Sequence, residues 1–297
     1  MGYIFHIIIT TLIYIIFAVS LDLELGFAGL YNFGQVAFFG IGAYTSALMS
    51  LAGIPIGITM ACGMLTAGLA GFLLSFPALR LTGDYFGVAT LVFAEMVRVF
   101  FVNEEWLTRG PMGLPGIPRP IWIGEGIGSL PRFAVFAGII ALATLFFVRR
   151  LISSPFSRAL KVIREDEYVA QAFGKNVFSL KLRTITIGSA LAGLAGSLWA
   201  HYVTFISPSD FTLNETILVL LCVVLGGKGT NWGPVLGTLI VMLTSESVRF
   251  LPIPAEMGRI VAPLQGMAYG CVLMIIMMKR PQGIIPEHRI RRENAQA

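Results

Sequence analysis

The hydrophobic positions of this chain form long uninterrupted runs separated by short polar stretches. A helix that crosses the hydrocarbon core of a bilayer needs about 20 mostly apolar residues. Residues 3–21 precede the first charged side chain, Asp22, and meet this requirement. Residues 25–79 carry no charge over 55 positions. At about 1.5 Å per residue this length suits two crossings, and the Gly-Ile-Pro sequence at 53–55 predicts the turn between them.

The same criterion predicts about 8–9 crossings in the whole chain. They lie at residues 3–21, 32–52, 56–78, 84–102, 133–148, 184–205, 213–225, 232–250 and 260–278. A loop rich in glycine and proline, 103–131, separates the fourth crossing from the fifth. A re-entrant piece at 25–31 is the alternative that would change the side on which the N-terminus lies.

Composition and charge support an all-α polytopic membrane protein. The chain is 56% hydrophobic and 12% charged, whereas soluble domains are roughly 25% charged. This excludes a soluble enzyme, a disordered chain, a collagen and a disulfide scaffold. Residues 149–183 and 279–292 hold 8 and 5 of the 21 Lys and Arg residues. Basic loops mark the cytoplasmic side, so we expect one transmembrane domain, 1–297, with a cytoplasmic loop (149–183), a cytoplasmic tail (279–297) and an external N-terminus.

Two short sequence words recur in the two halves of the chain. Ala-Gly-Leu-Ala-Gly occupies 67–71 and 192–196, and Asp84-Tyr85 is followed 126 positions later by Asp210-Phe211. In the predicted topology the first copy of the Ala/Gly word runs inward and the second outward, as in the inverted repeats of transporters. The alternative is coincidence, because small residues are frequent where membrane helices pack closely.

Residues 155–174 differ from the rest because they form an amphipathic, charged stretch. Ser154 and Pro155 suit a helix start and Gly174 suits the position after its end. The pattern predicts one helix of about five turns on the cytoplasmic side. Its apolar positions are Ala159, Leu160, Ile163, Val169, Ala170 and Phe173, and its charged positions are Arg158, Lys161, Arg164, Glu165, Asp166 and Glu167. A helix lying on lipid headgroups is the alternative to a docking helix for a soluble partner, and the mixture of acidic and basic residues favours the partner.

This helix carries a resemblance to a known family. The sequence RALKVIREDE at 158–167, AFGKNV at 172–177 and Lys181-Leu182 resemble the coupling segment of LivM-type permeases, which are inner-membrane subunits of branched-chain amino acid ABC importers. The resemblance extends to 32–47 (NFGQVAFFGIGAYTSA), 80–90 (RLTGDYFGVAT), 189–198 (SALAGLAGSL), 226–237 (GGKGTNWGPVLG) and 281–284 (PQGI).

The resemblance implies partners as well as a function. The chain would translocate leucine, isoleucine and valine across a bacterial inner membrane. It would pair with a second homologous permease, two cytoplasmic ATPase subunits and a periplasmic amino-acid-binding protein. The helix 155–174 would sit in a cleft of one ATPase. Its coupling residues would be Arg158, Ala159, Lys161, Arg164, Glu165, Asp166 and Gly174, of which Glu165, Asp166 and Gly174 match the acidic stretch and the glycine of the family.

The residues themselves predict no ATP chemistry in this chain. A P-loop needs Gly five residues before the Gly of its Gly-Lys pair and Ser or Thr directly after the Lys. Around Gly227-Lys228 these positions hold Cys222 and Gly229, so we expect 226–229 to be a tight cytoplasmic turn. We expect no cofactor and no enzyme activity, because no catalytic motif is found. Cys62, Cys222 and Cys271 lie in apolar runs at no metal-ligand spacing, which predicts buried small side chains.

Polar groups inside the crossings are candidates for the substrate path, because burying them in a membrane is costly. We select Asn32, Gln35, Asn214 and Glu215. Glu95 and Arg98 are three residues apart on one helix, which predicts a structural pair, and His201 is expected to be a packing residue.

Three other functions remain open from the sequence. An ABC importer for urea or short amides would have a similar permease. A stand-alone secondary transporter would need no docking helix and would carry a buried acid–base relay. A membrane-embedded enzyme fits least.

Overall fold

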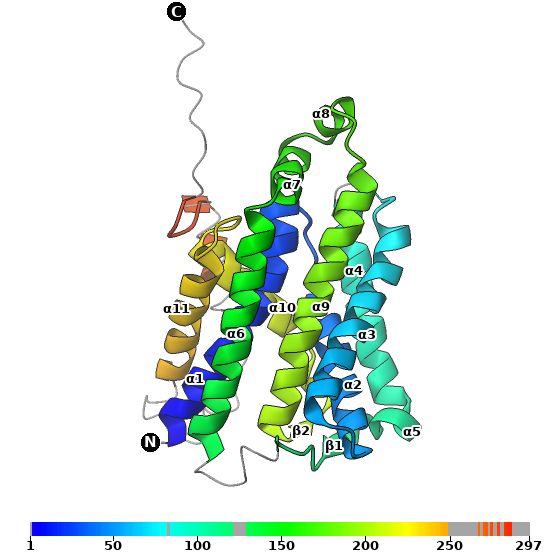
Figure 1. The fold of residues 1–297 in the computed structure, drawn as a ribbon, viewed down its shortest axis with the longest axis vertical. Coiled ribbons are helices and arrows are strands. Elements are labelled where there is room, and N and C mark those ends of the chain that lie inside the picture. Colours follow the sequence, from blue (N-terminus) through cyan, green and yellow to red (C-terminus); the bar gives the residue numbers. More distant parts are fainter. Residues whose placement is uncertain are drawn as a thin grey trace, which may run out of the picture.

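In the computed structural model, long helices run between two opposite ends of the molecule (Figure 1). One end carries the N-terminus and a two-stranded sheet, and the other carries α7 (Pro155–Glu165) and α8 (Glu167–Ala172). The structure describes residues 2–81, 84–120 and 129–248. Beyond these it describes residues 267, 270–272, 274–275, 278–279 and 282–286. Most of the predicted crossing at 260–278 and most of the tail at 279–297 lie outside the described residues.

Eight helices of the described part correspond to the first eight predicted crossings. They are α1 (Gly2–Asp22), α2 (Gln35–Leu51), α3 (Ile56–Ala78), α4 (Asp84–Asn103), α6 (Leu130–Ile152), α9 (Val177–Val203), α10 (Leu213–Gly226) and α11 (Gly233–Val248). Six spans of the described residues are long and apolar enough to cross a membrane, when α1 is counted to Phe27 and α10 from Pro208, whereas α2 and α11 are shorter. The all-helical, polytopic fold class is therefore confirmed.

The first crossing ends differently from the sequence prediction. After α1 the chain continues as a π-helix, η1 (Leu23–Phe27), and residues 29–34 are not helical before α2 begins at Gln35. Backbone N–H groups in this segment are bonded inside the protein: Gly34 N donates to Asn32 Oδ1 (2.8 Å) and Phe33 N to Thr90 Oγ1 (3.1 Å). Irregular backbone within a membrane domain is tolerated where it is buried in protein in this way.

The loop rich in glycine and proline folds back onto the end of α9. It contains α5 (Glu105–Thr108), a 3₁₀ turn, η2 (Gly110–Met112), and β1 (Leu114–Pro115), which pairs antiparallel with β2 (Phe205–Ile206). Arg119 Nη2 donates to the carbonyl of Tyr202 at 3.0 Å. A second 3₁₀ turn, η4 (Pro208–Asp210), follows β2 and leads into α10.

The two copies of the Ala/Gly word face each other where α3 and α9 cross. A Cβ on Gly193 would lie 2.3 Å from Ala67 Cβ, and one on Gly71 would lie 2.2 Å from Ser189 Oγ. Because Ala67 pairs with Gly193 and the later Gly71 with the earlier Ser189, the helices are antiparallel, as an inverted repeat requires. The second word pair is less alike, since Tyr85 is exposed and Phe211 is buried.

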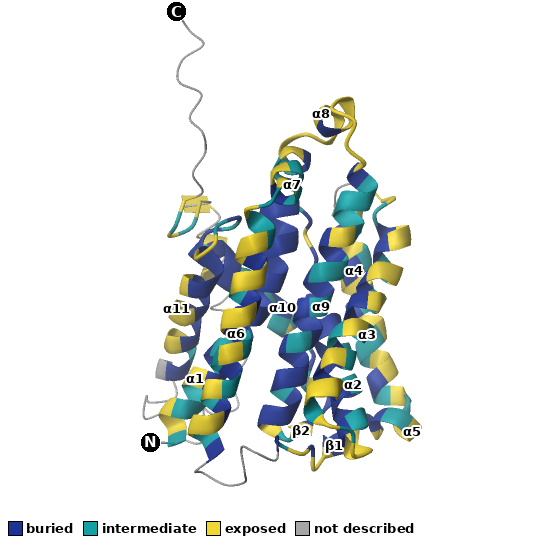
Figure 2. Cartoon of the chain, viewed as in Figure 1, coloured by how far each residue is buried: buried dark blue, intermediate teal, exposed yellow. Residues whose placement is uncertain are grey.

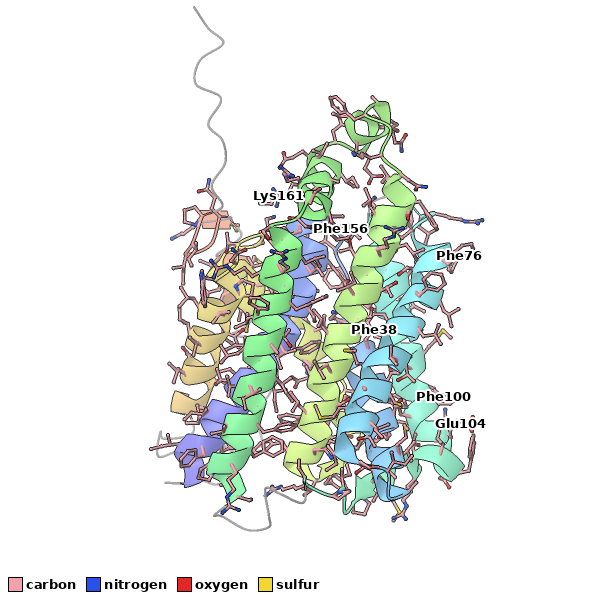
Figure 3. The ribbon with its side chains drawn as sticks, viewed as in Figure 1. Phe38, Phe76, Phe100, Glu104, Phe156 and Lys161 are labelled. Carbon is pink, nitrogen blue, oxygen red and sulfur yellow. The ribbon has the colours of Figure 1, made fainter. Side chains whose placement is uncertain are left out.

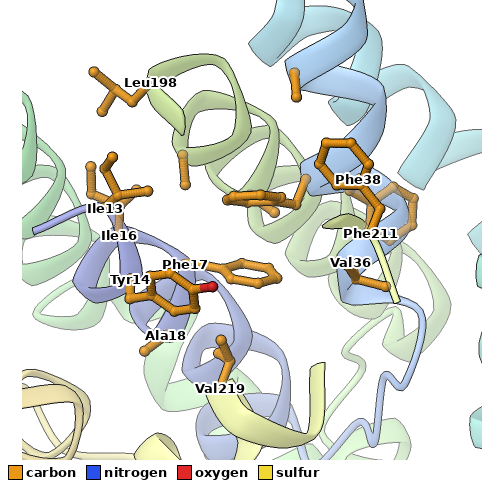
Figure 4. Packing of buried hydrophobic residues seen from close by; sticks show 14 of the residues in the cluster. Ile13, Tyr14, Ile16, Phe17, Ala18, Val36, Phe38, Leu198, Phe211 and Val219 are labelled. Atoms are coloured by element: carbon orange, nitrogen blue, oxygen red, sulfur yellow. The ribbon is translucent and has the colours of Figure 1, made fainter. Parts of the chain in front are cut away.

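The core lies around α1, α2, α9 and α10, and the outer helices are exposed on their lipid-side faces (Figure 2). Phe17 of α1 and Phe38 of α2 are fully buried in this core (Figure 4). Phe76 of α3 and Phe100 of α4 project from the bundle, where the chain leaves large apolar side chains uncovered (Figure 3). The prediction of buried cysteines is right for Cys222, but Cys62 is half-buried and Cys271 is exposed. Neither Cys62 nor Cys271 belongs to the buried core.

Candidate coupling segment and buried polar cluster

The charged stretch 155–174 is two short helices, so the prediction of one continuous helix is wrong. Asp166 has extended backbone angles, φ −159° and ψ 117°, which end α7 and precede α8. Its Oδ1 accepts hydrogen bonds from the backbone N–H of Tyr168 (2.8 Å) and of Val169 (3.2 Å). Aspartate is a poor helix-interior residue and a good N-cap because its side chain competes for backbone N–H groups. The break between the two helices could therefore have been predicted from the aspartate at position 166.

The two ends of the segment behave differently from each other. Ser154 stands at the N-cap position of α7, but its hydroxyl donates to the carbonyl of Leu151 (2.6 Å) and makes no cap. Gly174 follows Phe173 with φ +69°, so the prediction that it occupies the position after the helix end is confirmed. This left-handed conformation favours glycine.

The buried face of the segment is smaller than the apolar pattern predicts. Leu160, Ile163 and Ala170 are buried in a cluster with Leu23 and Phe27 of η1. Val169 and Phe173 were predicted to belong to the same apolar face, but they are exposed, Phe173 to 75%. The neighbouring Tyr168 is 83% exposed. The break at residue 166 turns α8, and it leaves these side chains without a surface to cover in the described chain.

The predicted coupling charges divide into an outward and an inward set. Arg158 and Glu165 are exposed, and Ala159 is half-buried. In contrast, Arg164 Nη1 donates to the carbonyl of Gly26 in η1 at 2.5 Å, and Lys161 Nζ lies 5.2 Å from the ring centroid of Phe27. Figure 3 shows Lys161 on α7, at the end of the molecule opposite the N-terminus.

The glycine-rich segment after α10 is a turn at this same end. Gly227 and Gly229 have positive φ angles of 117° and 72°. The backbone N–H of Gly229 donates to Asp22 Oδ1 at 2.8 Å. The predicted tight turn is confirmed, and the carboxylate at the end of α1 holds it.

A buried polar cluster gathers Asn32 and Gln35 around a carboxylate that the sequence analysis did not select. Asn32 Nδ2 donates to Glu24 Oε2 (2.7 Å) and to Gln35 Oε1 (2.9 Å). Gln35 Nε2 donates to Ser20 Oγ at 3.0 Å. Glu24 and Gln35 are completely buried, and Glu24 Oε1 has no hydrogen-bond partner in the described chain. Glu24 was overlooked because the apolar run ends at residue 21, which places this carboxylate at the membrane surface, whereas the π-helix turns it inward.

The other substrate-path candidates do not join this cluster. Glu215 accepts a 2.5 Å hydrogen bond from the hydroxyl of Tyr14, and the next residue, Thr216, accepts one from the backbone N–H of Val36 (3.2 Å). Asn214 is exposed. The structure therefore brings together two of the four candidates and leaves a third nearby, at the N-terminal end of α2.

The two structural assignments from the sequence are confirmed. Arg98 Nε donates to Glu95 Oε1 at 3.0 Å within α4. His201 is buried, with its ring nitrogens 2.9 Å from Ser46 Oγ and 2.8 Å from the carbonyl of Pro118. Within the described residues, no group of three or more His, Cys, Asp or Glu side chains could hold a metal ion.

Comparison with known proteins decides the family. The family described as branched-chain amino acid transport system / permease component matches residues 3–277. This chain belongs to that permease family. It is 33% identical to the high-affinity branched-chain amino acid transport system permease protein LivM of Escherichia coli K12, over 94% of this chain and 69% of the relative. A probable LivM permease of Methanocaldococcus jannaschii is 30% identical, over 94% of this chain and 92% of the relative.

A second type of permease in the family is also similar. LivH of Escherichia coli K12 is 23% identical over 92% of this chain and 91% of the relative. LivM and LivH of that organism are both named permeases of a high-affinity branched-chain amino acid transport system, which implies a pair of permeases in one importer. The chain is thus a multi-pass membrane protein whose relatives are named as transport permeases. No solved structure matches it.

Proposed function

We propose that this permease is one of two membrane-spanning subunits of an ABC importer that moves leucine, isoleucine and valine across the inner membrane of a bacterium. A homologous permease is its partner in the membrane. Two cytoplasmic ATPase subunits supply the energy and a periplasmic amino-acid-binding protein delivers the substrate. The resemblance of 158–167 and the family membership support this function, and the geometry of α7 and α8 is the observation that carries it.

That geometry is an apolar and charged surface projecting from one end of the bundle. Val162, Tyr168, Val169 and Phe173 are exposed there, beside Arg158 and Glu165. Large apolar side chains on a solvent-facing segment mark a protein interaction site, and tyrosine is enriched among residues that dominate binding energy. We assign the docking of the ATPase to this surface, which we call the docking face.

The predicted coupling residues have different roles in this proposal. Arg158, Ala159 and Glu165 belong to the docking face, whereas Asp166 and Gly174 set the conformation of α8. Lys161 and Arg164 face the membrane domain instead. The proposed substrate path passes the N-terminal end of α2, where Asn32 and Gln35 gather and Glu215 lies nearby, and Asn214 lies at its periphery. Apolar substrate side chains need few polar contacts there, so the binding protein supplies most of the specificity.

Affinity purification from a mild detergent tests the function directly. The tagged chain is expected to retain a second permease and ATPase subunits. Proteoliposomes are prepared with the ATPase subunits of that complex facing the lumen and the binding protein outside. They are expected to accumulate labelled leucine only when the lumen contains ATP. Uptake by the chain alone without nucleotide would show a stand-alone transporter. Uptake of urea in place of leucine would overturn the substrate.

The docking face has its own test. Replacement of Tyr168 and Phe173 together by Ala is expected to weaken binding of the ATPase subunits at least about tenfold, since truncating an interface anchor commonly costs more than about 1 kcal/mol. Titration of purified ATPase against permease in nanodiscs measures this affinity. The matched control is Trp106→Ala, because Trp106 is 79% exposed in α5 at the opposite end. Equal affinity for the two variants would contradict the assignment.

A further inference from the structure

The carbonyl end of the first membrane helix is bonded to the coupling segment. The last carbonyl groups of a helix have no partner within it. In η1 the carbonyl of Gly26 accepts a hydrogen bond from Arg164 Nη1, 138 residues later in the chain. A cation at this end also interacts favourably with the helix dipole. Arg164 therefore caps the end of α1 and η1 from another element.

The fit between α7 and η1 is close on both sides of this hydrogen bond. A Cβ on Gly29, which has φ +71°, would lie 2.8 Å from Arg164 Cγ, so the arginine stem lies directly across the chain there. The side chain of Arg164 is only 16% exposed, against 66% for its neighbour Glu165. Lys161 lies over the ring of Phe27. These contacts hold Arg164 Nη1 against the membrane domain, while Arg164 Nη2 lies 3.3 Å from Oε1 of the exposed Glu165.

The other side of η1 carries the buried polar cluster. Glu24 precedes Gly26 by two residues, and its carboxylate bonds to Asn32. The backbone carbonyl of Glu24 also accepts a hydrogen bond from Leu30 N at 3.0 Å. A Cβ on Gly188 of α9 would lie 2.1 Å from Glu24 Oε1, so the carboxylate rests against that helix. A displacement of η1 must therefore move Glu24 relative to α9 and to the start of α2.

We infer that Arg164 is a positioning residue that links α7 to η1 and transmits movement of the coupling segment to the cluster of Glu24, Asn32 and Gln35. It does not contact the ATPase. This inference rests on the proposed function, because it needs an ATPase to move α7. π-Helical segments depart from regular helix geometry and often occur at functional sites. This property suits η1 as the element whose conformation changes when α7 moves. Arg164 thus has a coupling role in this inference, as the sequence predicted, but it contacts η1 and not the ATPase.

Transport per ATP is the first measurement. Arg164→Met keeps the aliphatic stem and removes the donors to Gly26. In reconstituted importer we expect unchanged ATPase affinity, retained ATP hydrolysis and at least tenfold less leucine transported per ATP. Arg164→Lys, which keeps a cationic donor, is expected to restore part of the transport. The matched control is Arg150→Met, an exposed arginine at the end of α6, which should leave all three quantities unchanged.

Movement of the segment 29–34 is the second measurement. Tyr31 is 47% exposed in this segment. Tyr31→Cys, in a chain whose three native cysteines are replaced, is treated with a membrane-impermeant maleimide with and without ATP and vanadate. We expect the labelling rate to change with nucleotide when Arg164 is present and to become independent of nucleotide in Arg164→Met.

The outcomes separate the inference from the proposed function. Weaker ATPase binding by Arg164→Met would make Arg164 a docking residue and overturn the inference. Normal transport together with normal labelling in Arg164→Met would also overturn the inference. A fall in the amount of folded protein that lowers ATP hydrolysis and transport in the same proportion would overturn it as well. An unaltered chain that binds no ATPase would instead overturn the proposed function.

Discussion

Single residues without side chains determine how closely the central helices approach. A Cβ on Gly196 of α9 would lie 1.8 Å from the carbonyl oxygen of Phe39 in α2, and one on Gly42 would lie 2.2 Å from the carbonyl oxygen of Gly193. Both neighbours are backbone atoms, which cannot rotate away. Because lipid offers no hydrophobic driving force between helices, this close packing is a main source of their association.

Gly196→Ala is therefore expected to force α9 away from α2. We expect a loss of thermal stability of several degrees in detergent, measured by the unfolding midpoint of the purified protein, since forcing extra atoms into a packed core costs about 1–3 kcal/mol. Gly138→Ala in α6 is the matched control, because the Cβ would have only Leu12 Cδ1 nearby, at 3.9 Å. Equal midpoints for both variants would show that the α2–α9 contact adapts freely.

At the scale of the element, capping determines the shape of the coupling segment. The charge of Asp166 was expected to contribute to docking, but its carboxylate is bonded to backbone N–H groups of α8. The residue caps α8, in which Tyr168 is exposed, and Phe173 directly after α8 is exposed as well; we propose that the ATPase binds these side chains. A charged side chain can thus affect coupling through local conformation.

Two substitutions distinguish these roles of Asp166. Asp166→Asn keeps an N-cap acceptor and removes the charge, whereas Asp166→Ala removes both, at a cost of about 1 kcal/mol to the helix start. We expect the Asn variant to bind the ATPase subunits normally and the Ala variant to bind them several-fold more weakly, in the same nanodisc titration. Equal weakening in both variants would show that the charge itself makes the contact.

At the scale of the whole molecule, the helices connect two ends that carry different elements. The N-terminus, β1 and β2 lie at one end, and α7, α8 and the turn after α10 lie at the other (Figure 1). In the proposed orientation the basic loop 149–183 lies in the cytoplasm, so we expect the N-terminal end to face the periplasm, where a binding protein would dock. The antiparallel crossing of α3 and α9 lies between these ends.

Cysteine labelling in whole cells tests this orientation. Met112→Cys and Ser153→Cys place single exposed cysteines at the two ends, in a background without native cysteines. An impermeant maleimide added outside is expected to label position 112 in intact cells and position 153 only after the inner membrane is opened. The reverse pattern would invert the topology and place the docking face outside the cytoplasm.

Much of the fold could be predicted from the sequence, because the thickness of a bilayer imposes a length on every apolar run. This constraint located eight crossings with small errors at their ends. The run of glycines at 226–229 between apolar spans likewise predicted a turn, and the structure shows positive φ angles there, which favour glycine. Asn32 and Gln35 were selected for a general reason, the cost of polar groups in a membrane, without any knowledge of their partners.

Features that depend on neighbours along the chain could be located from the sequence alone: the spans, the charged segment between α6 and α9 and the glycine-rich turn. Which distant groups meet became known only from the folded arrangement of the helices. It placed Glu24 against α9 and Arg164 on the carbonyl of Gly26. These contacts depend on how η1 and residues 29–34 depart from regular helix geometry. The periodicity of the sequence does not show which distant segments come into contact when the chain folds.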